Sequence, residues 1–295
     1  MRVYSELMKS LTNGKFTITS EIDSPKGTNT KRIIESAKAM KGYVAAINVV
    51  DCPMGSVLMN SLVPCYLLYK ATGIESILQM TCRDRNIIGI QADLLGAAAL
   101  GIKNVLAITG DHPSLGDHPQ AKPVFDLDSV QLVKLIRKMV DEGTDLNGNL
   151  LDKPPKFHVG VAANPASSPL EPEIIKLEKK VEAGAEFVQT QGIYDMDILD
   201  KFLDATSHLD IKMLIGVIPL KSIGMAKFLS VKVPGIVIPG EIIKRLQNAN
   251  DPIEESISIS AEILKDIAER KVAGAHIMAV RMEHIVPRII EHAGI

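Results

Sequence analysis

The hydrophobic positions of this chain follow two alternating periods. Short runs rich in β-branched residues are followed by longer segments, such as 28–40 and 172–184, in which apolar residues recur every three or four positions. The first pattern is typical of strands and the second of amphipathic helices. Their regular alternation predicts βα units and a parallel sheet. The predicted strands lie near 16–21, 43–50, 74–81, 103–109, 156–163, 185–191, 212–217 and 272–280.

Eight such strands predict one α/β domain, a (β/α)8 TIM barrel that occupies residues 1–295. Two intervals are longer than one βα unit needs. The interval before the fifth strand carries Gly- and Pro-rich segments at 112–125 and 143–155 around a helix at 128–140, and residues 240–270 predict extra helices before the eighth strand. We expect the 112–125 segment to lie beside the carboxyl ends of the strands, and the 143–155 segment on the opposite face.

Polar side chains close seven of the predicted strands. The carboxyl ends of barrel strands meet at one mouth, which is where such barrels carry their active sites. We therefore expect these side chains to converge, and the pattern indicates an enzyme. The residues are Glu21, Asp51, Thr81, Asp111, Asn164, Gln191 and Arg281.

Four of these residues have chemistry of their own to offer. Glu21, if buried, can hold a proton and act as a general acid, although a solvated rim carboxylate fits its position equally well. Asp111 can accept a hydrogen bond from a heterocycle, but Gly-Asp is also a common turn signal. Gln191 and Arg281 suit a planar heterocycle or a carboxylated tail, and for Arg281 a salt bridge to Glu283 is the alternative.

The histidines do not predict a metal site. His112, Asp117 and His118 share one loop, yet their spacing matches no closed metal site, which needs three or four convergent ligands. His158 and His276 lie inside predicted strands, and we interpret both as packed or hydrogen-bonded core residues.

The chain lacks the common nucleotide-binding motifs. No Gly-rich phosphate loop or nucleophile elbow occurs, so any cofactor must be held by the barrel mouth. Lys179 and Lys180 precede the sixth strand, where they form a solvated face or reach an anionic phosphate. The residues themselves lead no further than an α/β barrel enzyme with a polar mouth of mixed charge.

Composition points to a small-molecule enzyme of the cytoplasm. Lys and Arg (33) nearly balance Asp and Glu (35) without a basic block, which argues against nucleic acid or a membrane surface as the main partner. Three cysteines without a C-x-x-C pair suggest reduced thiols. No leader-like or 18-residue apolar run is present, so we expect a soluble, cytoplasmic protein, by default a homo-oligomer.

Seven short motifs follow one another along the chain. They are Thr19-Ser20-Glu21 with Pro25, Leu78–Cys82, Ile108–Asp111, Lys179–Ala185, Gln189-Thr190-Gln191 with Tyr194-Asp195, Gly216–Pro219, and Val280-Arg281 with Glu283. Through these motifs the chain resembles the methylenetetrahydrofolate reductase family of flavin-dependent (β/α)8 barrels over almost its whole length. No single motif is specific, but seven in the correct order are.

The resemblance implies reduction of 5,10-methylenetetrahydrofolate to 5-methyltetrahydrofolate in a ping-pong scheme. NAD(P)H or another electron donor reduces the flavin, and folate then occupies the same face. The resemblance makes Glu21 the acid that helps to protonate the bridging folate nitrogen, and it places Asp111 beside the flavin and the pterin. Gln191 would bind folate, and Arg281 would lie at the substrate end of the site.

The resemblance also implies a flavin site, with FAD as the expected cofactor and FMN as the alternative. Thr81, Asp111, Asn164 and Lys180 would contact it, Lys180 through the phosphates or the ring. Aromatic residues frequent in the family are replaced here, for example by Asn164 and Gly192, so aromatic stacking on the flavin is thinned.

These departures resemble the branch of the family found in anaerobic one-carbon pathways. In that branch the reductase can work beside a separate zinc or iron–sulfur subunit, and three cysteines in this chain are too few to ligate an iron–sulfur cluster. Two alternatives remain. One is a flavin-free pterin-binding barrel that transfers a methyl group to a corrinoid protein, and the other is a non-catalytic folate-binding or scaffold subunit.

Overall fold

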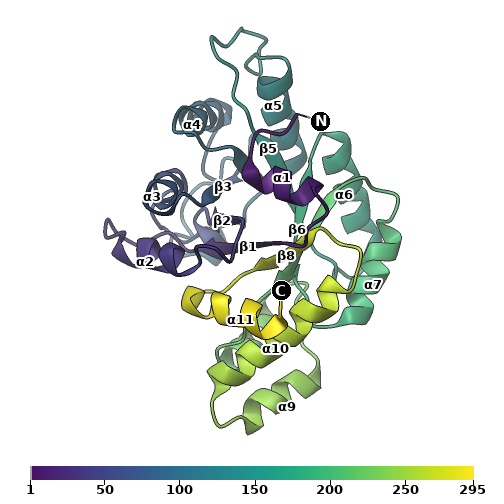
Figure 1. Ribbon diagram of the computed structural model, residues 1–295. Helices are drawn as coiled ribbons and strands as arrows, with labels where there is room; N and C mark the ends of the chain where they lie inside the picture. Colours follow the sequence, from purple (N-terminus) through teal and green to yellow (C-terminus); the bar gives the residue numbers. More distant parts are fainter. Residues whose placement is uncertain (1) are drawn as a thin grey trace.

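Residues 2–295, which the computed structural model describes, contain eight parallel strands that close into one barrel (Figure 1). Each strand pairs with the next along the chain, and β8 pairs with β1. The predicted (β/α)8 barrel is therefore confirmed. The strands are β1 (Thr17–Ile22), β2 (Ala46–Val49), β3 (Glu75–Thr81), β4 (Asn104–Ile108), β5 (His158–Ala163), β6 (Phe187–Gly192), β7 (Lys212–Val217) and β8 (Gly274–Ile277).

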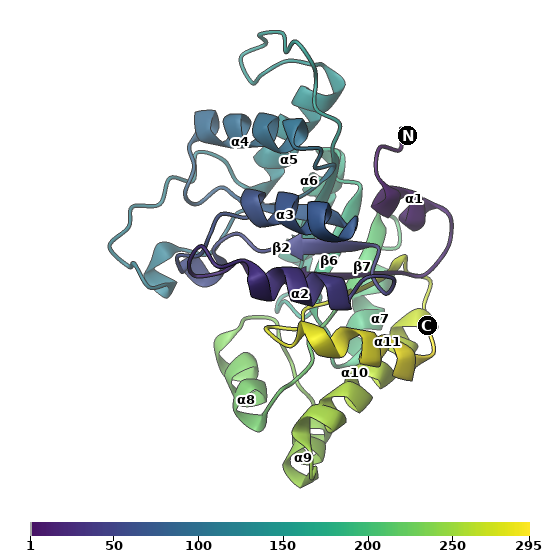
Figure 2. The ribbon, with the colours of Figure 1, turned by 60° about the vertical axis from the view of Figure 1, so that its left-hand side comes forward.

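Helices surround the barrel, as Figures 1 and 2 show from two directions. They are α1 (Glu6–Thr12), α2 (Lys31–Ala39), α3 (Leu62–Thr72), α4 (Ile87–Ala99), α5 (Ser129–Asp141), α6 (Glu171–Glu182), α7 (Met196–Ala205), α8 (Ile223–Lys232), α9 (Gly240–Asn248), α10 (Pro252–Ala268) and α11 (Val286–Ala293), with short 3-10 turns η1 (Pro53–Gly55), η2 (Pro113–Leu115) and η3 (Glu283–Ile285). The predicted 128–140 helix is α5, which a capping box of Asp128 and Gln131 starts. The predicted extra helices before β8 are α9 and α10.

Two strands are shorter than the sequence predicts by four or five residues, the largest differences in the barrel. β2 and β8 cover 46–49 and 274–277, where 43–50 and 272–280 are predicted. After β8 the backbone turns at Val280 and Arg281, whose φ angles are 40° and 66°. Strand pairing requires negative φ, so the ladder ends before this turn. Arg281 consequently lies in a loop beyond the strand.

Helix α1, which the sequence pattern does not predict, closes the amino-terminal end of the barrel. Its apolar face contributes Leu7, Met8 and Leu11 to a small core inside the barrel with Phe187 among its members. The Phe187 ring fills space that Gly160 leaves open, because a Cβ at Gly160 would lie 2.1 Å from the ring. Figure 1 shows α1 lying across this end. The barrel interior is therefore filled at this end and stays open toward the carboxyl ends of the strands.

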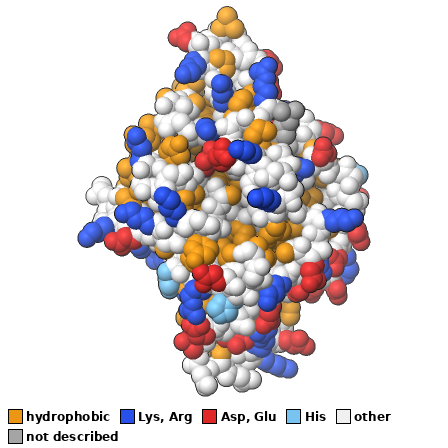
Figure 3. Space-filling view, viewed as in Figure 1, with side chains coloured by type: hydrophobic (Ala, Val, Ile, Leu, Met, Phe, Trp, Pro, Cys, Tyr) orange, Lys and Arg blue, Asp and Glu red, His pale blue; other side chains and the backbone are white. Residues whose placement is uncertain are grey.

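The segment at 143–155 follows the last turn of α5 and therefore lies toward the amino-terminal face, where it was predicted. A bridge between Thr144 and Leu150 pins its ends. Figure 3 views the molecule as Figure 1 does and shows acidic and basic side chains interspersed on this face, with hydrophobic side chains gathered near the middle. Among the described residues, no helix has the length and apolar character to cross a membrane.

Candidate active site

A cavity of about 330 Å³ opens at the carboxyl ends of the strands. This volume lies at the small end of the range that holds drug-sized ligands. Glu21, Gln191 and Asn164, from the ends of β1, β6 and β5, line it as predicted. Its remaining lining residues are Gln79, Leu106, Ala107, Ile108, Thr109, Ser129, Ala162, Ala163, Glu173, Lys176, Lys180, Gln189, Thr190, His276 and Met278.

The floor of the cavity is a layer of buried polar side chains inside the barrel. Asn48 of β2 and Gln189 of β6 form a reciprocal amide pair across the interior: Asn48 Nδ2 donates to Gln189 Oε1 at 2.6 Å, and Gln189 Nε2 donates to Asn48 Oδ1 at 3.0 Å. Gln189 Nε2 also lies 3.2 Å from Thr19 Oγ1 and 3.3 Å from His276 Nδ1. All four side chains are buried, so this network replaces the water that their polar atoms would otherwise need.

The Glu21 carboxylate faces the His276 imidazole at the edge of this buried polar layer. Glu21 Oε2 lies 3.6 Å from His276 Nε2, and the Glu21 side chain is 17% exposed against 3% for the imidazole. Two residues farther along, burial and the negative charge of Glu21 raise the pKa of Asp23. Glu21 therefore lies between a buried imidazole and a second carboxyl group, and it is open to a ligand.

A buried cation marks another wall of the cavity. Lys180 of α6 is 4% exposed, and its Nζ donates to the carbonyl of Ala162 at 2.5 Å. Burial, and then the charge of Lys176, lower its pKa to about 8, while Glu173 opposes the shift. No carboxylate forms an ion pair with Lys180 within residues 2–295, so this wall favours a phosphate, a carboxylate or another electron-rich group.

Asn164 is held between α6 and the loop after α8. Its backbone N–H donates to Glu173 Oε1 at 3.0 Å, and its Nδ2 donates to the carbonyl of Pro234 at 3.3 Å. Gly235 allows this approach, because its φ is +79° and an added Cβ would lie 1.8 Å from Asn164 Nδ2. The loop after α8 thus fixes one side of the cavity.

Gln191 reaches the cavity beside an irregular stretch of β6. The pairing of β6 with β7 shifts register between Gln189 and Gly192. There, Gln191 Oε1 accepts from the N–H of Gly192 at 2.9 Å, and Thr190 Oγ1 accepts from the N–H of Gly216. The Nε2 group of Gln191 has no partner among the described residues and can donate to a ligand.

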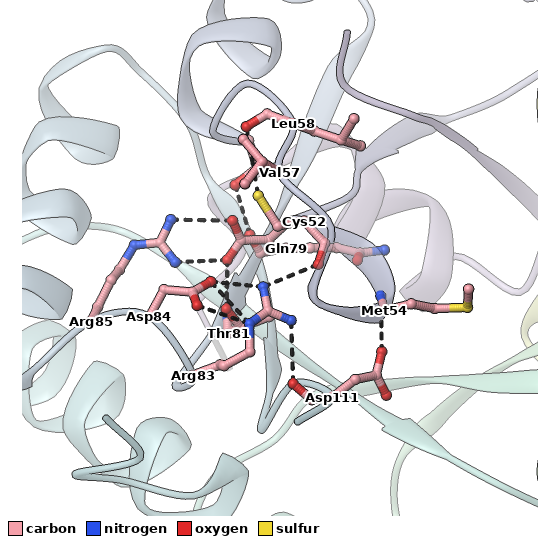
Figure 4. Close-up of polar contacts among 12 residues, drawn as sticks. Cys52, Met54, Val57, Leu58, Gln79, Thr81, Arg83, Asp84, Arg85 and Asp111 are labelled. Atoms are coloured by element: carbon pink, nitrogen blue, oxygen red, sulfur yellow. Dashed lines mark hydrogen bonds and ion pairs between the residues drawn. The ribbon is translucent and has the colours of Figure 1, made fainter. Parts of the chain in front are cut away.

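The ends of β2 and β3 meet in a buried ion pair outside the cavity (Figure 4). Asp51, whose side chain is 1% exposed, accepts from Arg85 Nη1 at 2.7 Å and from Arg85 Nη2 at 3.1 Å. It also accepts from the backbone N–H and the hydroxyl of Thr81, both at 2.9 Å. The Thr81 hydroxyl is therefore bound to Asp51 and is absent from the cavity lining.

A second arginine ties the loops after β2, β3 and β4 together. Arg83, nearly fully buried, donates to Asp84 and to the carbonyls of Cys52 and Asp111 (Figure 4). The Asp111 side chain is exposed, and its Oδ2 accepts from the N–H of Met54 at 3.0 Å. Asp111 thus fastens the β4 loop to the β2 loop at the rim.

Arg281 also lies at the rim. Its side chain is 69% exposed, with Nε 3.7 Å from Asp23 Oδ2. Glu283, the alternative partner that the sequence suggested, instead accepts from Arg32 at 3.0 Å. An exposed pair at this distance contributes little to stability, so Arg281 is free to turn toward a ligand.

Of the seven strand-end residues expected to converge, only three line the cavity; of the seven residues to which the resemblance assigns ligand contacts, four do. Glu21, Asn164, Lys180 and Gln191 line it, whereas Thr81, Asp111 and Arg281 do not. The ligand contacts assigned to all seven stay predictions.

Gln79, Gln189 and His276 line the cavity, and the sequence analysis did not assign them to the site. His276 is a buried, hydrogen-bonded residue, as predicted, but it also faces Glu21. Gln189 precedes Gln191 by two positions, and residues two apart point to one face of a strand. That alternation is the signal that could have found it.

No group of three or more His, Cys, Asp and Glu side chains that could hold a metal ion occurs within residues 2–295. The cysteines are free, and burial raises the pKa of Cys82 to about 12 and that of Cys65 further. Neither thiol is a ready nucleophile.

The donor set fits a flavin. Ala107, Ala162 and Ala163 offer a smooth wall to a flat ring, and side-chain amides can pair with the carbonyl and N–H groups of a flavin pyrimidine. Lys180 supplies a cation without a carboxylate partner. No Phe, Tyr or Trp is among the lining residues of the described chain, in line with the predicted loss of aromatic stacking.

Comparison with known proteins agrees with this geometry. The family model for methylenetetrahydrofolate reductase matches residues 6–294. Methylenetetrahydrofolate reductase 2 of Schizosaccharomyces pombe is 27% identical over 266 residues, which are 82% of this chain and 39% of that protein. The 5,10-methylenetetrahydrofolate reductase of Escherichia coli is 22% identical over 67% of this chain and 62% of its own length. The chain spans about two fifths to three fifths of these curated relatives.

One solved structure shares the whole fold. An uncharacterized protein from Clostridium thermocellum, described as binding two copies of 5-methyl-5,6,7,8-tetrahydrofolic acid, superimposes with a TM-score of 0.68. It covers 98% of this chain and 99% of its own, at 18% sequence identity. At this identity the likeness supports the barrel fold.

Proposed function

Because the chain belongs to the methylenetetrahydrofolate reductase family, we propose that it catalyses the flavin-dependent reduction of 5,10-methylenetetrahydrofolate to 5-methyltetrahydrofolate. The cofactor is FAD, with FMN as the alternative, and the electron donor and folate use the site in turn. Family membership and the folate-binding neighbour of the same fold support the substrate class.

The observation that carries the proposal is the pairing of an acid and a buried cation in one cavity. Glu21 lies at the edge of the buried polar floor, beside His276, and Lys180 lies in the wall formed by α6 and β5. The reaction adds one hydride and one proton to the substrate. A site for it needs a proton donor near the folate and a cradle for an electron-rich cofactor, and this cavity offers both.

Glu21 is the group placed to deliver the proton. A proton held on a carboxylate oxygen of Glu21 passes to the bridging nitrogen of the folate, whose five-membered ring then opens to an electrophilic iminium. His276 Nε2 faces Oε2 and stabilises the carboxylate that this transfer leaves behind. Gln191 orients the pterin through its free amide N–H groups.

Lys180, Asn164 and the alanine wall would hold the flavin. The bound flavin supplies hydride transfer, and the protein controls position and proton delivery. Thr81, Asp111 and Arg281 are absent from the cavity lining. Their assigned roles require them to turn inward when a ligand binds.

The test is an anaerobic visible spectrum of the protein after flavin addition and desalting, recorded before and after 5-methyltetrahydrofolate. A retained flavin band that bleaches supports the proposal. We expect Glu21→Gln to keep the flavin while bleaching slows by about 10²-fold, the usual effect of losing a general acid. Asp197→Asn, an exposed carboxylate on α7 away from the cavity, is the matched control.

A colourless protein that still binds 5-methyltetrahydrofolate would contradict the reductase and favour the corrinoid-dependent methyltransferase or the folate-binding subunit. Near-normal bleaching by Glu21→Gln would remove Glu21 from proton delivery. The same spectra identify the donor. Bleaching by NADH or NADPH makes that nucleotide the direct donor, and bleaching by folate alone assigns the donor role to a partner subunit with zinc or iron–sulfur centres.

A further inference from the structure

We propose that Gln189 is a positioning residue that sets the tautomer of His276, so that the Nε2–H of the imidazole faces Glu21. The assignment of a catalytic consequence rests on the proposed function. The tautomer itself can be measured without any cofactor or substrate. Sequence patterns gave no role to Gln189 or to its partner Asn48.

The hydrogen-bonding capacity of the Gln189 amide nitrogen constrains His276. Gln189 Nε2 is a donor with no lone pair to offer, and it lies 3.3 Å from His276 Nδ1. One of its two N–H groups donates to Asn48 Oδ1, and the other lies between Thr19 Oγ1, at 3.2 Å, and His276 Nδ1. An accepting Nδ1 is favoured, because an N–H there would face the Gln189 N–H and leave the Thr19 hydroxyl without an acceptor. Thr19 Oγ1, 2.9 Å from Nδ1, can donate to the same lone pair.

The consequence appears on the other side of the ring. A neutral imidazole carries one proton, so an accepting Nδ1 leaves that proton on Nε2. Nε2 lies 3.6 Å from Glu21 Oε2, so its N–H is directed toward that carboxyl group. The chain of contacts from Asn48 through Gln189 and His276 to Glu21 thus links β2, β6, β8 and β1.

Asn48 holds the orientation of the Gln189 amide. The reciprocal pair is satisfied equally well if both amides rotate by half a turn, and Gln189 Oε1 would then face His276 Nδ1. That rotation would force the proton onto Nδ1 and turn the Nε2 lone pair toward the Glu21 carboxylate. When Glu21 is ionised, repulsion between the lone pair and the negative charge disfavours this arrangement. Glu21 and Gln189 therefore select the same tautomer from opposite sides of the ring.

The experiment is 15N NMR of the protein labelled at histidine, with the signal of His276 assigned by its loss in His276→Gln. Wild type should show His276 as the Nε2–H tautomer. Gln189→Leu removes the donor and should give a mixture of tautomers, and Gln189→Glu, which places an acceptor against Nδ1, should give Nδ1–H. Gln247→Leu on the exposed face of α9 is the matched control and should leave the signal unchanged.

The double variant Asn48→Leu with Gln189→Leu covers the case in which the single variant does not fold. Replacing both partners by apolar groups avoids a buried unpaired amide, and the donor to Nδ1 is still lost. With flavin bound, the limiting rate of bleaching by 5-methyltetrahydrofolate should fall by about fivefold in the Gln189→Leu variants, as expected for one neutral hydrogen bond, with the folate dissociation constant unchanged.

Two results would overturn the inference: Nδ1–H in wild type, or an unchanged His276 signal in Gln189→Leu and in the double variant. A wild type with the Nε2–H tautomer that does not bleach with folate would instead refute the proposed reductase and leave the assignment of Gln189 intact. A changed tautomer with an unchanged bleaching rate would refute the catalytic consequence alone.

Discussion

Replacing Lys180 by methionine should stabilise the protein without ligand and weaken its hold on a flavin. The variant keeps the length and apolar stem of the side chain and removes only the ammonium group. Lys180 is 4% exposed and forms no ion pair within the described residues, so its charge is buried without a carboxylate partner. A site built to bind an anion is expected to carry such a cost.

The size of the expected stabilisation follows from the pKa of Lys180. Burial lowers the pKa of Lys180 from its usual 10.5 to about 8. One pKa unit corresponds to about 1.4 kcal/mol, so the buried charge costs roughly 3 kcal/mol at neutral pH. The hydrogen bond to Ala162 returns about 1 kcal/mol. We expect Lys180→Met to raise the free energy of unfolding by about 2 kcal/mol, equivalent to roughly 5 °C in Tm.

The stability difference between Lys180→Met and wild type should depend on pH, and the sign of that dependence can be worked out. Lys180 has a lower pKa in the folded state than in the unfolded state, so its cost is fully present below pH 8 and disappears as the pH rises toward 10.5. The advantage of Lys180→Met over wild type should therefore shrink between pH 8 and pH 9.5. Lys179→Met, on the exposed face of the same helix, should show neither the stabilisation nor this trend.

The assays are urea unfolding of the apoprotein across this pH range and flavin titration at pH 7. We expect flavin affinity to fall at least tenfold in Lys180→Met and to stay at the wild-type level in Lys179→Met. A Lys180→Met apoprotein that is less stable than wild type at pH 7 would refute the argument that burying the ammonium without a carboxylate partner costs stability. Unchanged flavin affinity would separate Lys180 from cofactor binding.

Two further predictions concern the framework around the cavity. Asp51→Asn should lower the free energy of unfolding by about 3 kcal/mol, because it leaves Arg85 without its buried carboxylate, and an unchanged urea midpoint would contradict this. Gly235→Ala should lower the free energy of unfolding by at least about 1 kcal/mol more than Gly148→Ala. Both glycines have positive φ, which costs an alanine about 1–2 kcal/mol. Only at Gly235 does the new Cβ also collide with a side chain, that of Asn164. Equal losses in the two variants would show that the loop after α8 moves freely away from Asn164.

The barrel and the end at which its site lies could be predicted from the pattern of residues along the chain. Hydrophobic period reports local burial, so alternating strand and helix patterns were enough to predict eight βα units and the extra helices α9 and α10. Polar residues at strand ends marked the mouth, because parallel strands bring their carboxyl ends to one side. Glu21, Asn164 and Gln191 reached the cavity for that reason.

Which polar groups bind each other and which remain free could be read only from the folded chain. Thr81 ends a strand as predicted, yet Asp51 from the neighbouring strand accepts its hydroxyl hydrogen. Gln189 and His276 are far apart in the chain and meet because barrel closure brings β6 and β8 to one interior layer. Hydrogen-bond partners depend on strand register and on the shape of loops between distant segments. Periodicity along a single chain carries no information about either.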